Sequence, residues 1–345
     1  MRVTNAMMTR SVIWNISDNL NRMNTVYTQM SSGERIEQPS QDPVAASKSL
    51  EYQAYITELN QYSENVEDAD GWMSVTESSV ESMIEIVTRV NELTLQANND
   101  TLTSEDRMKI DEEIGQLQDE LLKLGNTDYG GDYIFAGYDT DSPPFTLIDK
   151  LGGSVTAYKG SALNLQGPFD SSLTDADILS WYNVQTSGPF TNEEIHYPTS
   201  KLQTTNVNLN GHEVFGSGED SLMANLDFLR MYLGGQSSYK YVDETVTPPV
   251  VVVKEIDVDQ IIEDLNKSAD TLIEKQTEVG SRVNSNTLKG ERILSDIEMY
   301  SNLLSGAKDA DMAELSVAMA EAEMVYEASL IASSKIIMPT LLNFI

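Results

Sequence analysis

The sequence predicts a mainly α-helical chain that carries a β-rich domain in its middle. First, apolar residues recur at alternating steps of three and four near both ends of the chain, which indicates long helices that pack on one another. Second, proline and glycine, which interrupt helices, are frequent between residues 139 and 218. Third, short segments in that interval have the composition of strands. The helices from the two ends should therefore form an antiparallel coiled-coil bundle.

The first helix is predicted from Thr4 to Ser32. Its apolar residues follow the a and d positions of a coiled coil. Gly33 comes directly after the last of them, where helices commonly end in a left-handed residue. We expect this seam to pack against neighbouring subunits, and it consists of Ile13, Ile16, Leu20, Met23, Tyr27 and Met30.

A second helix is predicted to begin at Pro43 and to run for about 55 residues, or roughly 80 Å. Asp42 is a suitable N-cap, and proline fits the first helical position because its missing N–H is not needed there. The alternation of three and four then holds from Tyr52 to Val90. A helix of this length is not an ordinary globular element.

A third helix is predicted from Thr103 to Gly125. Thr103 is its N-cap, and Asp106 stands at N3, where a carboxylate favours the start of a helix. The short preceding break should fold this helix back antiparallel to the second. Its apolar face consists of Ile110, Ile114, Leu117, Leu121 and Leu124.

The middle of the chain reads as short strands and turns. Residues 133–138, 154–158 and 206–215 are strand-like, and Asn210-Gly211 suggests a hairpin turn. Residues 220–233 read as a helix. The stretch from Tyr239 to Val253 could be a strand of a sheet or an exposed arm, and the pattern does not decide between them.

Helical periodicity returns at Val258 and continues, with an interruption at Gly290, until Gly306. Asp311 and Glu314 then begin a last helix in capping-box style. Its period drifts towards 3.6 residues, and it is rich in alanine and serine, which permit close helix approach. We expect it to pack against neighbouring subunits through Met312, Leu315, Met319, Tyr326, Leu330, Ile337, Leu341 and Phe344.

These elements are nested: each helical layer combines a segment from the N-terminal half of the chain with one from the C-terminal half. They predict a terminal helical domain of residues 1–41 and 307–345, a long-helix bundle of 42–138 and 219–306, and an inserted β-rich domain of 139–218. The terminal layer has only two helices, which bury too little surface to be stable alone. We therefore predict that both ends are disordered in the monomer and fold when neighbours supply the missing surface.

Composition excludes several functions. The net charge of −33 argues against nucleic acid or an anionic membrane as a partner, since both require a basic surface. Cysteine is absent, which excludes disulfides, thiol catalysis and zinc–thiolate sites. His196 and His212 form no metal or catalytic motif, and residues 68–71 lack the later ligands of a calcium loop. We expect no enzyme activity, no cofactor and no metal, and we expect no cleaved signal peptide.

Two motifs carry a family resemblance. Residues 31–36 read Ser-Ser-Gly-Glu-Arg-Ile and residues 39–46 read Pro-Ser-Gln-Asp-Pro-Val-Ala-Ala; together they resemble a signature of the bacterial flagellin-like family. Residues 126–137, Pro143-Pro144-Phe145 and the ending Leu-Leu-Asn-Phe-Ile are closer to the hook–filament junction members than to flagellins. Gln41 departs from the aspartate that is commoner there. The likeness covers both helical arms, about two thirds of the chain.

The resemblance implies a structural adaptor between the hook and the filament of the flagellum. Its implied partners are the first hook-associated protein, flagellin, copies of itself in a ring, the flagellar export apparatus and a cytosolic export chaperone. Its implied location is extracellular, at the hook–filament junction. Two alternatives stay open: a flagellin filament subunit, and a secreted adhesin or wall-active protein with its activity in the middle domain.

Overall fold

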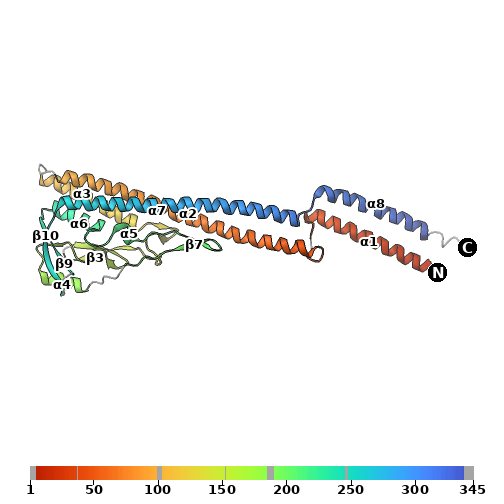
Figure 1. Ribbon diagram of the computed structural model, residues 1–345, viewed down its shortest axis with the longest axis horizontal. Helices are drawn as coiled ribbons and strands as arrows, with labels where there is room; N and C mark the ends of the chain where they lie inside the picture. The colour runs from red at the N-terminus through yellow and green to blue at the C-terminus, as the bar shows by residue number, and fades with distance from the viewer. Residues whose placement is uncertain are drawn as a thin grey trace. The chain divides into compact units, whose positions relative to one another are not determined.

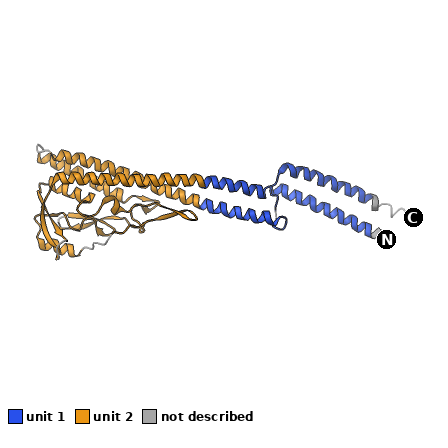
Figure 2. Cartoon of the chain, viewed as in Figure 1, with its two compact units in different colours: residues 1–61, 293–345 blue, residues 62–292 orange. Residues whose placement is uncertain are grey.

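The computed structural model describes residues 5–36, 38–98, 103–151, 153–184, 190–244 and 248–337. The chain divides into two compact units (Figure 2). Unit 1 comprises residues 1–61 and 293–345, and unit 2 comprises residues 62–292. Figure 1 shows the long helices α2 (Pro43–Ala97) and α7 (Val258–Lys308). Each of these helices contributes to both units.

Unit 1 adds α1 (Asn5–Ser32) and α8 (Met312–Ile337) to the first part of α2 and the last part of α7. The predicted start and end of α1 and the predicted starts of α2, α7 and α8 are confirmed to within a residue. Gly33 ends α1 with φ +75°, the left-handed conformation that glycine adopts without strain. The Asp42 carboxylate accepts hydrogen bonds from the N–H groups of Val44 and Ala45, so it caps α2. Asp311 caps α8 in the same way.

Unit 2 packs α2 and α7 with α3 (Ser104–Gly125) and α6 (Leu222–Leu233). The predicted Thr103 cap is confirmed, because its hydroxyl accepts from the Asp106 N–H at 3.2 Å. Arg89 of α2 and Glu113 of α3 lie 2.7 Å apart, as an antiparallel fold-back requires. The core draws on all four helices and includes Met73, Met83, Val87, Ile114, Leu121, Leu226, Leu229, Leu265 and Leu272.

Among the described residues of unit 2, the strands form four small antiparallel sheets. Two are paired strands (β1–β2 and β7–β8), and two have three strands, in the orders β3-β4-β5 and β10-β9-β6. Short helices α4 (Asp175–Val184) and α5 (Gly211–Phe215) lie between strands in the sequence. The strands are β1 (Asp128–Tyr129), β2 (Asp132–Tyr133), β3 (Phe145–Lys150), β4 (Gly153–Tyr158), β5 (Ser161–Ala162), β6 (Phe169–Asp170), β7 (His196–Ser200), β8 (Gln203–Asn206), β9 (Ser238–Asp243) and β10 (Val250–Glu255).

Two strand predictions are wrong. Of residues 133–138, only Tyr133 belongs to a strand, and the following residues turn inward so that Phe135 is fully buried. The chain after β8 forms no hairpin at Asn210-Gly211; Asn210 instead precedes the short helix α5. The reason is packing, because Gly211 lies directly against the rings of Phe145 and Tyr158, where a regular hairpin turn would expose it.

The open question about residues 239–253 is answered by pairing. β9 and β10 pair antiparallel: Ser238 lies opposite Glu255 at one end of the pair, and Asp243 lies opposite Val250 at the other. β6 pairs with the other edge of β9. Residues 239–243 and 250–253 are therefore part of a sheet, and strands extend beyond residue 218. Helix α7 also runs unbroken through Gly290 and Gly306. The three-domain division remains a prediction. Within the described residues, no helix has the length and apolar character needed to cross a membrane.

Gly211 offers a test of this packing. A Cβ added there would lie 2.5 Å from the Phe145 ring and 2.7 Å from the Tyr158 ring, so Gly211→Ala should destabilise unit 2 by about 1–3 kcal/mol through overpacking. Chemical denaturation followed by tryptophan fluorescence measures this. Gly153→Ala is the matched control, because its Cβ would meet nothing within 4 Å. Equal stability of the two variants would contradict the packing described.

Candidate functional site: an assembly surface

Helices α1 and α8 pack antiparallel, with Cα atoms of the two helices within 8 Å of each other. Small side chains allow this approach. Near the middle of the pair, the Asn19 amide donates to the Ser329 hydroxyl at 2.6 Å. The packed face, buried or half-buried, includes Val12, Ile16, Asn19, Met23, Val26 and Met30 from α1, and Leu315, Met319, Ala322, Tyr326, Ser329 and Ser333 from α8.

The chain between α1 and α2 is fastened to the break between α7 and α8. The Arg35 N–H donates to the Lys308 carbonyl at 2.7 Å, and the Ala310 N–H donates to the Gly33 carbonyl at 2.9 Å. The Lys308 ammonium lies 2.6 Å from the Glu34 carboxylate. The Ser-Ser-Gly-Glu-Arg-Ile motif thus forms a two-sided clamp that sets the register of α1 against α8.

The predicted seam of α1 is divided by the structure. Ile16, Met23 and Met30 face α8 and are half-buried. Ile13, Leu20 and Tyr27 are exposed by 60%, 39% and 61%. These three are spaced seven residues apart, so they form one stripe beside the packed face. We call them the α1 stripe. The register had predicted a single seam, but the helix carries two adjacent apolar faces.

The predicted residues of α8 divide similarly. Leu315, Met319 and Tyr326 face α1, whereas Met312 and Leu330 are exposed. Leu341 and Phe344 lie outside the described residues, as does the side chain of Ile337. Whether any of these residues contacts another subunit remains a prediction.

Sequence reasoning missed a second apolar face on α8. Val317, Met324 and Ile331 are exposed by 61%, 69% and 60%, and their spacing of seven places them opposite the packed face. We call them the α8 stripe. Trp14, exposed by 70%, was also missed. The available signal was that the apolar residues of α8 are spread around the helix rather than gathered on one face.

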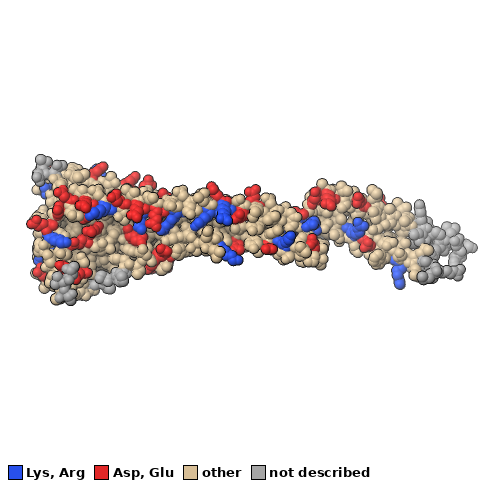
Figure 3. All heavy atoms as spheres, viewed as in Figure 1, with Lys and Arg blue, Asp and Glu red and all other residues tan. Residues whose placement is uncertain are grey.

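Unit 1 buries little of its own apolar surface. Among its described residues, Ile293 and Leu315 are the fully buried hydrophobic side chains, at 6% and 9% exposure. Tyr300 stacks on Tyr55 with ring centroids 5.2 Å apart, yet Tyr55 stays 41% exposed. The visible face of α1 and α8 is largely neither acidic nor basic (Figure 3). Large apolar side chains exposed in stripes, as on α1 and α8, are typical of an interaction site.

The charges on the two terminal helices differ in sign. Along its described side chains α1 carries Arg10, Arg22 and a single acid, Asp18, whereas the described side chains of α8 carry only acids: Glu314, Glu321, Glu323 and Glu327. In a chain of net charge −33, a helix with more basic than acidic groups is unusual. Opposite charges on two helices favour contacts between them, within one chain or between chains.

The two histidines do not form a reactive site. His196 lies 3.2 Å from Glu194, and both side chains are about half exposed. His212 stacks on Phe190 with ring centroids 5.5 Å apart, and its Nε2 meets the Asn192 side chain at 3.0 Å. Across the described ranges, no three His, Asp or Glu side chains are grouped so as to hold a metal ion.

Comparison with known proteins bears on this surface. Residues 3–140, which include α1, α2 and α3, match the bacterial flagellin N-terminal helical region. The chain is similar to the flagellar hook-associated protein 3 of Escherichia coli, 34% identical over 145 residues, which are 42% of this chain and 44% of that protein. The Salmonella typhimurium protein of the same name is 30% identical over 175 residues, 50% of this chain and 53% of that one.

The chain thus spans about half the length of the curated relatives it matches. A solved Vibrio parahaemolyticus chain, assigned as a flagellar hook-associated protein, superposes with a TM-score of 0.58 at 17% identity. The match covers 78% of this chain and 100% of that one. The resemblance seen in the sequence and the predicted fold class are both confirmed.

Because unit 1 buries few apolar side chains, we predict that its terminal helices are less stable than the helical core of unit 2. Backbone amides of residues 5–32 and 312–334 should exchange hydrogen faster in the monomer than those of residues 72–93, because few buried side chains hold the terminal helices. Mass spectrometry after pulsed exchange measures this. Comparable protection in both regions would contradict the expectation.

His212 predicts a pH dependence in unit 2. Burial lowers the pKa of His212, and its Nδ1 is buried without a hydrogen-bond partner among the described residues. The unfolded chain then binds the proton more readily, so the free energy of unfolding should fall as pH drops from about 7.5 through the ordinary histidine value near 6.5. His212→Gln should remove this dependence, and His196→Gln should retain it. Denaturation at pH 7.5 and 5.5 makes the comparison; identical slopes in both variants would contradict it.

Proposed function

We propose that this chain is a structural adaptor of the bacterial flagellum that joins the hook, through the first hook-associated protein, to the flagellin filament. The observation that carries the proposal is the pair of terminal helices whose exposed stripes have no partner within the described chain. The homology to flagellar hook-associated protein 3 supports the same role. No enzyme activity is proposed.

The proposed mechanism is helix packing coupled to polymerisation. The α1 stripe and the α8 stripe each offer three large apolar side chains to neighbouring subunits. Burying such a side chain contributes about 1.5–3 kcal/mol, so the two stripes together represent on the order of 10 kcal/mol gross. Ordering the terminal helices opposes much of this gain. Assembly, rather than folding of the monomer, would then decide when the ends are ordered.

The partners follow from this role. Copies of the chain would form a ring, with flagellin on one side and the first hook-associated protein on the other. We propose that the chain leaves the cell through the flagellar export apparatus with a cytosolic chaperone, and acts outside the cell at the hook–filament junction. Residues 1–41 and 307–345 would form the inner layer, 42–138 and 219–306 the next, and 139–218 the outer part.

The matched family region is named for flagellin, so the filament subunit itself is the competing function. A strain that lacks this chain separates the two. The adaptor role predicts complete hooks without filaments and flagellin lost to the medium. Normal filaments in that strain would overturn the adaptor role, and loss of the filament protein itself from the medium would favour the flagellin role.

The α8 stripe can be tested in the complemented strain. Val317→Ser combined with Met324→Ser and Ile331→Ser should leave the monomer folded, because all three side chains are exposed. It should still remove most filaments, since about 5 kcal/mol or more of gross burial is lost. Ile273→Ser, at an exposed position of α7 in unit 2, is the control. Electron microscopy counts filaments per hook; wild-type numbers with the triple variant would contradict the role of the stripe.

A further inference from the structure

A polar cavity in unit 2 takes no part in the assembly surface. It is open to solvent on one side and has a volume of about 370 Å³, within the range of roughly 300–1,000 Å³ typical of small-molecule sites. Its walls come from α3, α6, β3, β4 and the segment that leads into β6. Leu122, Leu147 and Met231 supply apolar lining. The remaining lining is mostly polar and charged.

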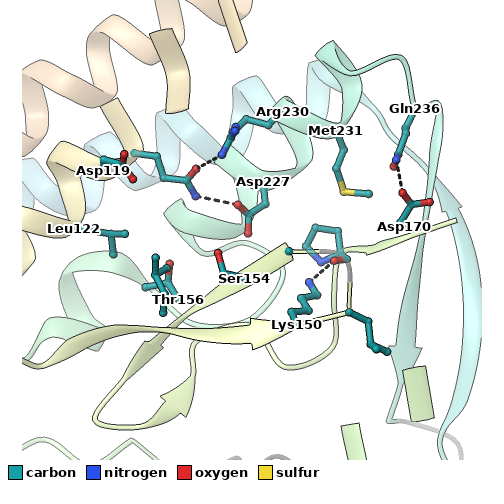
Figure 4. A pocket seen from close by; sticks show the side chains of 15 residues that line it. Asp119, Leu122, Lys150, Ser154, Thr156, Asp170, Asp227, Arg230, Met231 and Gln236 are labelled. Atoms are coloured by element: carbon teal, nitrogen blue, oxygen red, sulfur yellow. Dashed lines mark hydrogen bonds between the residues drawn. The ribbon is translucent and has the colours of Figure 1, made fainter. Parts of the chain in front are cut away.

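Two opposite charges enter this cavity without pairing. In Figure 4, Asp227 extends from α6 and Lys150 from β3, with Ser154 of β4 between them. Asp227 accepts from the Gln118 amide at 2.9 Å, and Lys150 donates to the Pro168 carbonyl. Among the described residues, no carboxylate lies within ion-pairing distance of the Lys150 ammonium. Burial lowers the pKa of Lys150 to about 8 and raises the pKa of Asp227, so both groups are poorly solvated.

The residues that line the cavity have both hydrogen-bond donors and acceptors left without a partner among the described residues. The Gln236 amide donates to Asp170 at 2.8 Å, but its oxygen is buried and accepts nothing from the described residues. Ser154 and Thr156 add hydroxyls that can donate or accept. A ligand that forms hydrogen bonds with these polar groups must carry donors and acceptors close together. Three aspartates against one lysine and one arginine also disfavour an anionic ligand (Asp119, Asp170 and Asp227 against Lys150 and Arg230).

We propose that this cavity binds a neutral saccharide. A sugar hydroxyl accepts from Lys150 while donating to Asp227, which a cation or an anion alone cannot do. A neighbouring hydroxyl on the same ring bonds to the exposed Ser154 hydroxyl of β4. The C–H faces of the ring lie against Leu122, Leu147 and Met231. The proposal is independent of the flagellar role.

Calorimetric titration of the full chain with glucose, N-acetylglucosamine, cellobiose and chitobiose tests the proposal. We expect saturable binding of at least one sugar, and amide NMR shifts confined to residues around Gln118, Ser154 and Gln236. Asp227→Asn should weaken binding at least tenfold, and so should Ser154→Ala, a small change that keeps β4 intact. Glu120→Gln is the matched control, because Glu120 pairs with Lys123 on the exposed side of α3.

Three outcomes overturn the proposal. One is no saturation with any of the four sugars by the folded wild-type chain. The second is equal binding by the wild type and both cavity variants, which would place the sugar elsewhere. The third is binding of free serine, a small zwitterion that also carries a hydroxyl, with no binding of sugars. Filament counts in the Ser154→Ala strain should match the wild type, so the saccharide site and the adaptor role stand or fall separately.

Discussion

The structure depends on one constraint: two helices cannot bury all the apolar surface that α1 and α8 carry. One face of each helix is used in their mutual packing, and the Asn19–Ser329 hydrogen bond marks the middle of that contact. The α1 stripe and the α8 stripe are left in water. Unit 2 buries far more apolar surface, since four helices share one core. This unequal burial is why we propose that unit 1, unlike unit 2, depends on assembly for its stability.

The clamp around Gly33 fixes the positions of the apolar side chains that α1 and α8 leave exposed. Glu34 and Arg35 bind the chain at the α7–α8 break, so α1 and α8 meet in one register rather than sliding along each other. Fixed register keeps the two stripes at fixed angles on their helices. A neighbouring subunit can be complementary to side chains whose positions are fixed. If α1 and α8 could slide along each other, the positions of the exposed side chains would vary and no single complementary surface would fit them. The Ser-Ser-Gly-Glu-Arg-Ile motif thus has a structural role, because it positions α1 against α8.

Helix boundaries could be predicted from the sequence because capping is local: Asp42, Thr103 and Asp311 act on residues beside them. The turn at Asn210-Gly211 could not, since distant rings of Phe145 and Tyr158 decide it. On α1, the heptad pattern located apolar residues but could not say which of two adjacent faces meets α8. The α8 stripe was missed because apolar residues are spread around α8, so a periodicity argument finds no single seam.

The central claim is that the exposed stripes become buried when the chain assembles. The chain has no native cysteine, so Met324→Cys introduces a single reactive thiol on the α8 stripe. Its rate of modification by a thiol reagent can be compared between the monomer and the chain in purified hook–filament preparations. The account predicts rapid reaction in the monomer and strong protection in the assembly, while an exposed control at Ile273→Cys changes less. Equal reactivity of Met324→Cys in both states would contradict it.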